Sequence, residues 1–239
     1  MKPGNATVHI IRPNLTSREM DNECLNEGEK MRAERFRFPD DADYWSACRA
    51  ALKRILGRYL GMNPQDVPIV YTPLGKPFLA TPFDSLHFNL SHCNDIALVA
   101  VTGEGPIGVD VEPLDRAPEL LSCEGTFCHF FETTWLPEKL EERAAALLRV
   151  WTSKEATLKA AGTGLTHPPE RIEIQFRSSG IFAVSDFNFE RFDSISIKEL
   201  KHPELMGYSA FLAAPMSVKS VSYSFNEQTF ETGDRFKGE

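Results

Sequence analysis

The sequence contains no long apolar run. Among its 239 residues, no stretch approaches the roughly 18–20 consecutive apolar residues that a membrane span requires. The first 15 residues also lack the apolar core of a signal peptide. The composition, with 42% hydrophobic and 25% charged residues, is typical of a globular protein. We therefore expect a cytoplasmic protein with no membrane partner.

Cysteine is scarce, and its spacing is uninformative. None of the five cysteines forms a Cys-x-x-Cys unit, so the pattern lacks the ligand spacing of a zinc site. Free thiols in a reducing compartment are a simpler interpretation of an odd number than a disulfide framework. The five are Cys24, Cys48, Cys93, Cys123 and Cys128.

The sequence has fewer basic than acidic residues overall, but one segment has an excess of basic residues. The formal net charge of −8 argues against a broad nucleic-acid-binding surface. Within residues 30–58 the balance reverses, and we expect a local basic surface that could receive an anionic ligand or partner. Its eight basic residues are Lys30, Arg32, Arg35, Arg37, Arg49, Lys53, Arg54 and Arg58.

The order of helical and extended patterns predicts an α+β fold in two halves. Helical spacing covers residues 23–36, 44–60 and 138–161, whereas short β-type runs cover 8–11, 67–71, 86–90, 96–101 and 107–111. Residues 172–223 alternate as antiparallel strands, and 120–136 are ambiguous. A Gly-rich joint at 103–106 divides the chain into halves at 1–104 and 105–225, followed by a polar tail at 226–239. An interface between two halves is a common place for a ligand cleft.

Two carboxylates are two residues apart in a β-branched run. Asp110 and Glu112 of Gly-Val-Asp-Val-Glu would share one face of a strand, and Val109 and Val111 would point into a core. Such a pair repels unless a cation neutralises it, and oxygen ligands suit Mg²⁺ or Mn²⁺. The alternative is a solvated edge strand with two surface acids.

A second motif places an acid and a base on one helical face. Glu155 and Lys159 are four residues apart in Trp-Thr-Ser-Lys-Glu-Ala-Thr-Leu-Lys, and Gly162 and Gly164 follow directly. The alternatives are an ordinary surface ion pair, or a capping box in which Thr152 begins the helix.

Several other polar residues are candidates for anion binding. His92 and Ser91 follow a predicted strand and could donate to a phosphate, although a cluster that stabilises a turn is the alternative. Lys76 lies in a rigid Gly-Lys-Pro turn. For Lys76, Arg49 and Arg32 the alternative is an exposed, solvated side chain.

Taken in order, the motifs resemble those of the surfactin-type 4′-phosphopantetheinyl transferases. The resemblance spans residues 75–164 and extends more loosely toward residue 30. Cys93 stands where many relatives have serine. The four motifs are Gly75-Lys76-Pro77, Phe88-Asn89-Leu90-Ser91-His92-Cys93, Gly108-Val109-Asp110-Val111-Glu112, and Trp151-Thr152-Ser153-Lys154-Glu155-Ala156 with Lys159, Gly162 and Gly164.

The resemblance implies a pseudo-dimer of two similar halves with antiparallel sheets and coenzyme A in the cleft between them. The implied reaction moves phosphopantetheine from coenzyme A to a serine of an apo acyl or peptidyl carrier protein and releases 3′,5′-ADP. Because two halves within one chain already form the cleft, a monomer is expected. A non-catalytic coenzyme A- or carrier-binding protein and a metal-dependent phosphohydrolase remain as alternatives.

The resemblance also implies roles for individual residues. The Mg²⁺ ion, or Mn²⁺, would be bound by Asp110, Glu112 and Glu155. Glu155 would also deprotonate the carrier serine, and Lys159 would support the departing 3′,5′-ADP. The expected coenzyme A contacts are Lys76, Ser91, His92, Arg49, Arg32 and Lys154.

Overall fold

The computed structural model describes residues 2–13, 18–185 and 195–225. The predicted polar tail from residue 226 lies outside the described residues. The first half of the chain contains β1 (Asn5–Ile11), α1 (Arg18–Cys24), α2 (Glu27–Ala33), α3 (Pro39–Leu60), η1 (Pro64–Asp66), β2 (Ile69–Tyr71), β3 (Pro77–Leu79), β4 (His87–Cys93) and β5 (Ile96–Thr102).

The second half follows the joint at residues 103–106. Its elements are β6 (Gly108–Pro113), η2 (Leu114–Ser122), α4 (Glu124–Phe127), α5 (Phe130–Thr133), α6 (Leu140–Ala161), η3 (Gly164–Thr166), η4 (Pro169–Arg171), β7 (Ile172–Arg177), β8 (Gly180–Ser185), β9 (Ile195–Glu199), η5 (Pro203–Leu205), β10 (Tyr208–Pro215) and β11 (Ser220–Phe225). The ambiguous stretch at 120–136 forms the end of η2 and the short helices α4 and α5.

The two halves pair their strands in the same order. The first sheet runs β11-β1-β5-β4, and the second runs β6-β10-β9-β8-β7. In the first half β1 precedes the 22-residue helix α3 and pairs antiparallel with β5, which in turn pairs antiparallel with β4. In the second half β6 precedes the 22-residue helix α6 and pairs antiparallel with β10, which in turn pairs antiparallel with β9. The sequence therefore predicts the α+β class correctly, with antiparallel pairing within each half.

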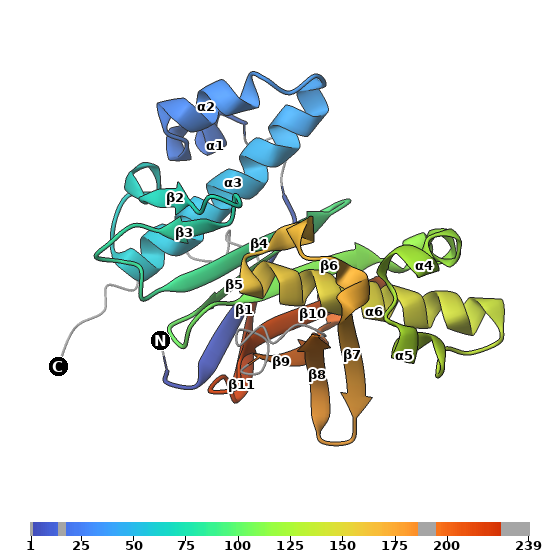
Figure 1. Cartoon of the computed structure of the whole chain (residues 1–239). Coiled ribbons are helices and arrows are strands. Elements are labelled where there is room, and N and C mark those ends of the chain that lie inside the picture. Colours follow the sequence, from blue (N-terminus) through green and yellow to red (C-terminus); the bar gives the residue numbers. More distant parts are fainter. Residues whose placement is uncertain (1, 14–17, 186–194, 226–239) are drawn as a thin grey trace.

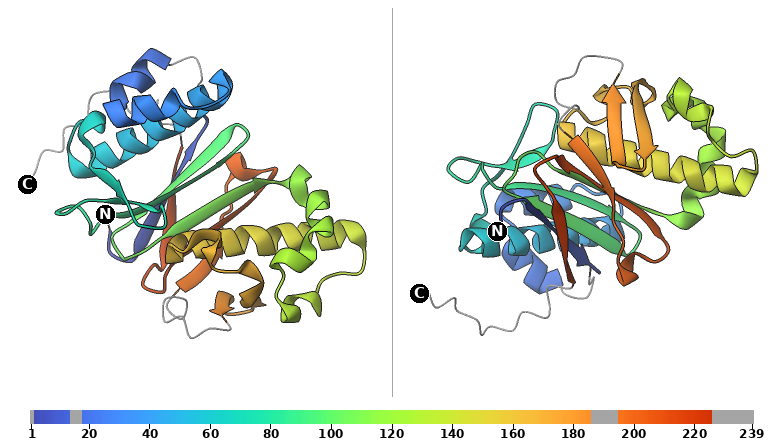
Figure 2. Two further views of the ribbon diagram at one scale, coloured as in Figure 1. Left: turned by 45° about the horizontal axis from the view of Figure 1, so that its top comes forward. Right: turned by 90° about the horizontal axis from the view of Figure 1, so that it is seen from below.

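The sheets pack face to face, and the long helices cover their outer faces (Figures 1 and 2). Val8 and Leu98 of the first sheet share a core cluster with Val109 and Leu212 of the second. On the outer face of the first sheet, α3 buries Leu52, Leu56 and further apolar residues against β5. On the second, α6 packs against β7, β9 and β10. Apolar burial on both faces of each sheet is the main force that fixes this layered arrangement.

Strand β11 corrects the predicted division of the chain. Residues 172–223 were expected to form antiparallel strands of the second half, but Ser220–Phe225 pairs parallel with β1 in the first sheet. The second half therefore ends before β11 rather than at residue 225. No helix in the described ranges is long and apolar enough to cross a membrane.

The hairpin β4–β5 also differs in detail from the expectation. The strand was expected to end at Leu90, with residues 91–95 forming a turn, but β4 continues to Cys93. The turn is shorter and uses Asn94 at a φ of 46°, a left-handed conformation that Asn adopts more readily than most residues. Ser91 and His92 consequently point to opposite faces of a strand instead of sharing a loop.

Candidate functional site: a carboxylate cluster between β6 and α6

Strand β6 and helix α6 approach each other unusually closely at Gly108. A Cβ atom at Gly108 would lie 2.0 Å from the carbonyl oxygen of Ala156 and 2.4 Å from the amide nitrogen of Ala160. Only glycine fits such an approach, and the helix contributes small alanine residues at the same place. Because side chains alternate along a strand, Asp110 and Glu112 share the face of Gly108 and point toward α6. The close approach therefore brings both carboxylates to Glu155 and Lys159.

Asp110 lies at the centre of the cluster. Its side chain is buried, and its Oδ1 accepts hydrogen bonds from Lys159 Nζ at 2.6 Å and Ser91 Oγ at 2.8 Å. Its Oδ2 is also buried but has no hydrogen-bond partner among the described residues. Buried polar atoms are usually paired, so this oxygen is a candidate ligand for a group from outside the chain. A solvated edge strand, the alternative at the sequence level, does not describe this carboxylate.

Glu112 is held by two donors from the second half. Its Oε1 accepts from Arg116 Nη1 and, at 3.3 Å, from Trp151 Nε1. The Glu112 side chain is 14% exposed, and the Arg116 guanidinium lies 6.0 Å from the centre of the Trp151 ring. The arrangement fixes Glu112 beside Asp110 and neutralises part of its charge.

Glu155 completes the cluster from α6. Its Oε1 is buried without a hydrogen-bond partner in the described part of the chain. Burial raises the pKa of Glu155 above its usual value, and the negative charge of Asp110 raises it further, although Lys159 acts in the opposite direction. A carboxyl group with a raised pKa is a better proton acceptor from a hydroxyl than an ordinary surface glutamate.

Both alternatives for the helical motif are wrong. Thr152 lies in the middle of α6 and donates to Leu148 O, so it is not an N-cap. The ion pair of Lys159 is formed with Asp110 at 2.6 Å instead of with Glu155. The lysine therefore connects the helix to strand β6.

The oxygen donors of the cluster suit a hard divalent cation, but they are not already arranged around one metal position. Two buried carboxylate oxygens, on Asp110 and Glu155, have no hydrogen-bond partner in the part of the chain that the structure describes, and oxygen donors suit Mg²⁺ or Mn²⁺. Yet within the described ranges no three potential ligands are already gathered around one point. Lys159 and Arg116 each form an ion pair with one oxygen of Asp110 and Glu112, respectively.

Ser91 and His92 separate at this site. Ser91 faces strand β6 and donates to Asp110, so it belongs to the carboxylate cluster. His92 faces α3, where its ring lies edge-on to Tyr44 with a centroid distance of 5.2 Å. Burial lowers the pKa of His92, and the charge of Lys159 lowers it further. The two side chains therefore point to opposite faces of β4, which does not support the expectation that both contact one phosphate.

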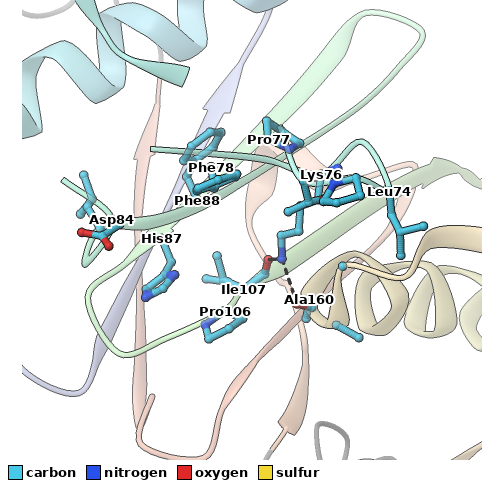
Figure 3. Close-up of a pocket in the computed structure, with 15 residues that line it drawn as sticks. Leu74, Lys76, Pro77, Phe78, Asp84, His87, Phe88, Pro106, Ile107 and Ala160 are labelled. Atoms are coloured by element: carbon cyan, nitrogen blue, oxygen red, sulfur yellow. Dashed lines mark hydrogen bonds between the residues drawn. The ribbon is translucent and has the colours of Figure 1, made fainter. Parts of the chain in front are cut away.

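A cavity of about 530 Å³ lies at the joint between the halves, and none of the acids of the cluster lines it. It is lined by the β2–β3 turn, the start of β4, Pro106 and Ile107, and the end of α6 (Figure 3). Lys76 reaches across it and donates to Ala160 O at 2.8 Å and Ile107 O at 3.2 Å. Lys76 is therefore not the exposed turn lysine of the alternative interpretation, because it binds carbonyl groups of the second half.

Two of the predicted coenzyme A contacts lie elsewhere. Lys154 is fully buried and pairs with Glu132 at 2.6 Å, which leaves its ammonium group no exposed surface for a phosphate, so its assignment as a coenzyme A ligand is wrong. Arg49 is also buried, and its Nε donates to Glu29 at 2.6 Å. This ion pair gives no support to the assignment of Arg49 to a coenzyme A phosphate.

The predicted basic surface is correspondingly smaller than the sequence indicated. Lys53 binds Glu29 inside the first half, and Arg54 pairs with Asp21. Arg32 stays on the surface of α2, with its guanidinium 5.1 Å from the centre of the Trp45 ring.

Sequence reasoning missed three residues that shape the site. Gly108 sets the distance between β6 and α6, Arg116 neutralises Glu112, and Trp151 donates to Glu112 through its ring nitrogen. Trp151 belongs to a recognised motif, but its contact with Glu112 is tertiary. Arg116 follows Glu112 across a strand end, where a spacing of four residues carries no signal.

Comparisons with known proteins cover most of the chain. Residues 106–213 match the 4′-phosphopantetheinyl transferase superfamily, and residues 12–104 match the 4′-phosphopantetheinyl transferase, N-terminal family. The two matches meet at the joint between the halves.

Individual relatives agree with these matches. The 4′-phosphopantetheinyl transferase HetI of Nostoc sp. is 38% identical over 189 residues, which cover 72% of this chain and 78% of that protein. A 4′-phosphopantetheinyl transferase of Bacillus subtilis is 24% identical, with 72% of this chain and 76% of that protein covered. The L-aminoadipate-semialdehyde dehydrogenase-phosphopantetheinyl transferase of Xenopus laevis is 30% identical, with 64% and 54% covered. By its identity to HetI and by the family matches to both halves, the chain belongs to the 4′-phosphopantetheinyl transferases.

Proposed function

We propose that this enzyme transfers the 4′-phosphopantetheine arm of coenzyme A to a serine of an apo acyl or peptidyl carrier protein and releases 3′,5′-ADP, in a reaction that requires Mg²⁺. The observation that carries the proposal is that Asp110 and Glu155 each have a buried carboxylate oxygen without a hydrogen-bond partner among the described residues, with Glu112 on the same face of β6 as Asp110. Family membership supports the transfer itself. The metal requirement and the roles of the residues rest on the cluster.

The reaction needs a base for the serine hydroxyl. The serine oxygen attacks the phosphorus that carries the pantetheine group, and the bond from this phosphorus to the 3′,5′-ADP oxygen breaks. Glu155 accepts the serine proton, a task for which its raised pKa suits it. The leaving 3′,5′-ADP carries away the electron pair of the broken bond.

Cationic groups must stabilise charge on the diphosphate as this bond breaks. Lys159 has a partly exposed ammonium between Asp110 and Ser91, from which it can donate to a leaving phosphate. Asp110, Glu112 and Glu155 would hold the Mg²⁺ ion, and when bound it would offset the negative charge of the diphosphate.

Coenzyme A would lie along the junction of the two halves. The cavity beside Lys76 borders the end of α6, close in sequence to Lys159, and its size suits part of a large nucleotide ligand. His92 and Arg32 remain candidates for the phosphate groups. The shared strand order of the halves supports their description as a pseudo-dimer whose cleft holds the ligand. We further propose that the enzyme acts as a monomer in the cytoplasm.

Intact-mass measurement on apo-carriers tests the proposal. The protein is incubated with coenzyme A, with or without Mg²⁺, and with a panel of apo acyl and peptidyl carriers. A mass gain of one phosphopantetheine that depends on Mg²⁺ and on the carrier serine is expected, with 3′,5′-ADP in the supernatant.

Two other outcomes would identify the alternatives. Coenzyme A binding without any mass gain across the panel would indicate a non-catalytic binding protein. Free phosphopantetheine formed without a carrier would indicate a phosphohydrolase. A mass gain that is equal without Mg²⁺, in the presence of a chelator, would contradict the metal requirement alone.

A further inference from the structure

Arg116 occupies a carboxylate that the proposed metal site would use. It lies in η2, and its Nη1 donates to Glu112 Oε1, the same oxygen that receives the hydrogen bond from Trp151 Nε1. None of the four motifs described above contains Arg116, and its guanidinium has no step to perform in the proposed reaction. Its place beside the cluster therefore calls for a different explanation.

The two partners of this ion pair differ in exposure. The Glu112 side chain is 14% exposed and accepts a hydrogen bond from Trp151 Nε1, whereas the Arg116 side chain is 36% exposed. Arg116 also has a second acid within reach, since its Nε lies 3.9 Å from Glu119 Oε2, and the Glu119 side chain is 76% exposed. The guanidinium can therefore leave Glu112 for solvent or for Glu119, while the carboxylate stays in place.

The charges of the cluster explain why a counter-ion is needed. Asp110 and Glu112 lie on the face of β6 that approaches α6 near Glu155, and like charges in a partly buried site repel strongly where water is scarce. Lys159 neutralises Asp110 through Oδ1, and Asp110 Oδ2 has no hydrogen-bond partner among the residues described. A cation could meet that oxygen without displacing Lys159. At Glu112, by contrast, a divalent cation and the guanidinium would share one carboxylate, and two positive charges in contact oppose each other.

We propose that Arg116 is an internal counter-ion that competes with the divalent cation for Glu112, so that the ion binds only as the guanidinium moves away. The inference rests on the metal site of the proposed function. It assigns to the apo enzyme a self-neutralised state in which Arg116 stabilises the acid cluster. Metal affinity is then lower than the three carboxylates alone would give, because the free energy of the ion pair is lost on binding.

Mn²⁺ binding to the full chain, without coenzyme A or carrier, tests the inference directly. Free Mn²⁺ is measured by its electron paramagnetic resonance signal during titration of the wild type and of Arg116→Gln. We expect the Kd of the variant to be about three- to tenfold lower, the scale of a partly exposed charge-assisted ion pair. Arg116→Lys, which keeps the charge, is expected to return most of the way to the wild-type Kd.

A matched variant separates this competition from a general change in charge. Arg149 lies on α6, as Glu155 does, and forms a partly exposed ion pair with Glu199 at 2.6 Å. Arg149→Gln removes one positive charge whose ion pair is with Glu199 and with no acid of the cluster, and it is expected to leave the Kd within about twofold of the wild type, because surface charges are screened by salt. Tighter binding in Arg116→Gln alone supports the inference.

Several results would overturn it. These are an unchanged or higher Kd in Arg116→Gln, or equal tightening in Arg116→Gln and Arg149→Gln. Absence of Mn²⁺ binding in all of these proteins would overturn the inference together with the metal assignment. Carrier modification measured by mass would in that case still decide separately whether the proposed transfer occurs.

Discussion

Two charged clusters, one in each half, are built on opposite principles. In the first half Glu29 accepts from Arg49 Nε at 2.6 Å and from Lys53 Nζ at 2.7 Å, and its Oε2 also accepts from the amide of Asn26 at 2.9 Å. One acid thus faces two bases. In the second half three acids face Lys159 and Arg116, and within the described ranges one buried oxygen each of Asp110 and Glu155 has no hydrogen-bond partner.

The two clusters shift the pKa values of their glutamates in opposite directions. Burial alone would raise the pKa of Glu29, but the hydrogen bonds from Lys53 and Asn26 and the charge of Arg49 outweigh it and lower this pKa. For Glu155, burial and the charge of Asp110 raise the pKa. A fully paired cluster is suited to holding α2 against α3, whereas an incompletely paired one keeps oxygens for a ligand.

The largest expected effect separates the clusters by activity. Glu155→Gln removes the proposed base and a metal ligand, and we expect transfer to a carrier to fall by at least about 10²-fold. The free energy of unfolding should stay equal or rise, because a buried negative charge beside Asp110 is removed. Rates from intact mass and a urea unfolding curve measure both. Glu141→Gln, at an exposed position of α6, is the control, and near-wild-type transfer in Glu155→Gln would contradict the assignment.

The next effect should appear in stability instead. Glu29→Gln leaves the fully buried ammonium of Lys53 without its carboxylate, and we expect a loss of about 3–5 kcal/mol in the free energy of unfolding. The folded fraction should keep its transfer rate. Glu27→Gln breaks an exposed pair with Lys30 and should cost no more than about 1 kcal/mol. If Glu29→Gln were stable yet inactive, the first cluster would be functional after all.

The pH dependence of stability should differ in sign between the clusters. Because the pKa of Glu29 lies below its usual 4.5, its contribution is present above pH 4.5 and is lost as the pH falls through the folded-state pKa. The pKa of Glu155 lies above 4.5, so the folded protein binds this proton more tightly, and stability falls as the pH rises from 4.5 through the folded-state pKa.

Urea unfolding between pH 3 and 8, on the order of one curve per pH unit, checks these signs. Relative to the wild type, Glu155→Gln should gain stability as the pH rises above 4.5. The difference in the free energy of unfolding between the wild type and Glu29→Gln should shrink as the pH falls below 4.5. If stability relative to the wild type changed with pH in the same direction for both variants, the predicted difference between the two clusters would be wrong.

The smallest expected effect concerns Trp151. Trp151→Phe loses the hydrogen bond to Glu112 but keeps an aromatic ring against Phe127, whose centroid lies 5.3 Å away. We expect kcat/KM to fall by about two- to tenfold, the range of a single net hydrogen bond. Trp135→Phe, on an exposed ring near Phe176, serves as the control. Unchanged kcat/KM in Trp151→Phe would show that the hydrogen bond from the Trp151 ring nitrogen to Glu112 does not contribute to activity.

The sequence predicts best where periodicity and burial coincide. The helix at 138–161 and the strand that carries Asp110 were correctly placed, since α6 covers Leu140–Ala161 and Val109 and Val111 are buried in the shared core. The extension of β4 through Ser91 and His92 was missed, because Asn, Ser and His favour turns by composition while pairing with β5 overrides that preference.

Contacts between distant residues could not be predicted in the same way. Nothing in the local pattern distinguishes Lys154, which turns inward to Glu132, from Glu155 beside it, because the rotation of a helix is decided by packing. The same holds for Arg49 and Lys53, whose acid partner lies in another helix. The role of Gly108 required the position of α6, which only tertiary structure provides.

The parallel pairing of β1 with β11 has a consequence for biosynthesis. The side chains of Asn5 and Ser222 form a hydrogen bond at 3.0 Å across 217 positions of sequence, so β1 gains this outer neighbour only after those residues have been synthesised. At roughly 5–20 residues per second this wait is about 10–40 s. Meanwhile β1 exposes a free edge, and a nascent chain that lacks β11 should depend on chaperones more than the released protein does.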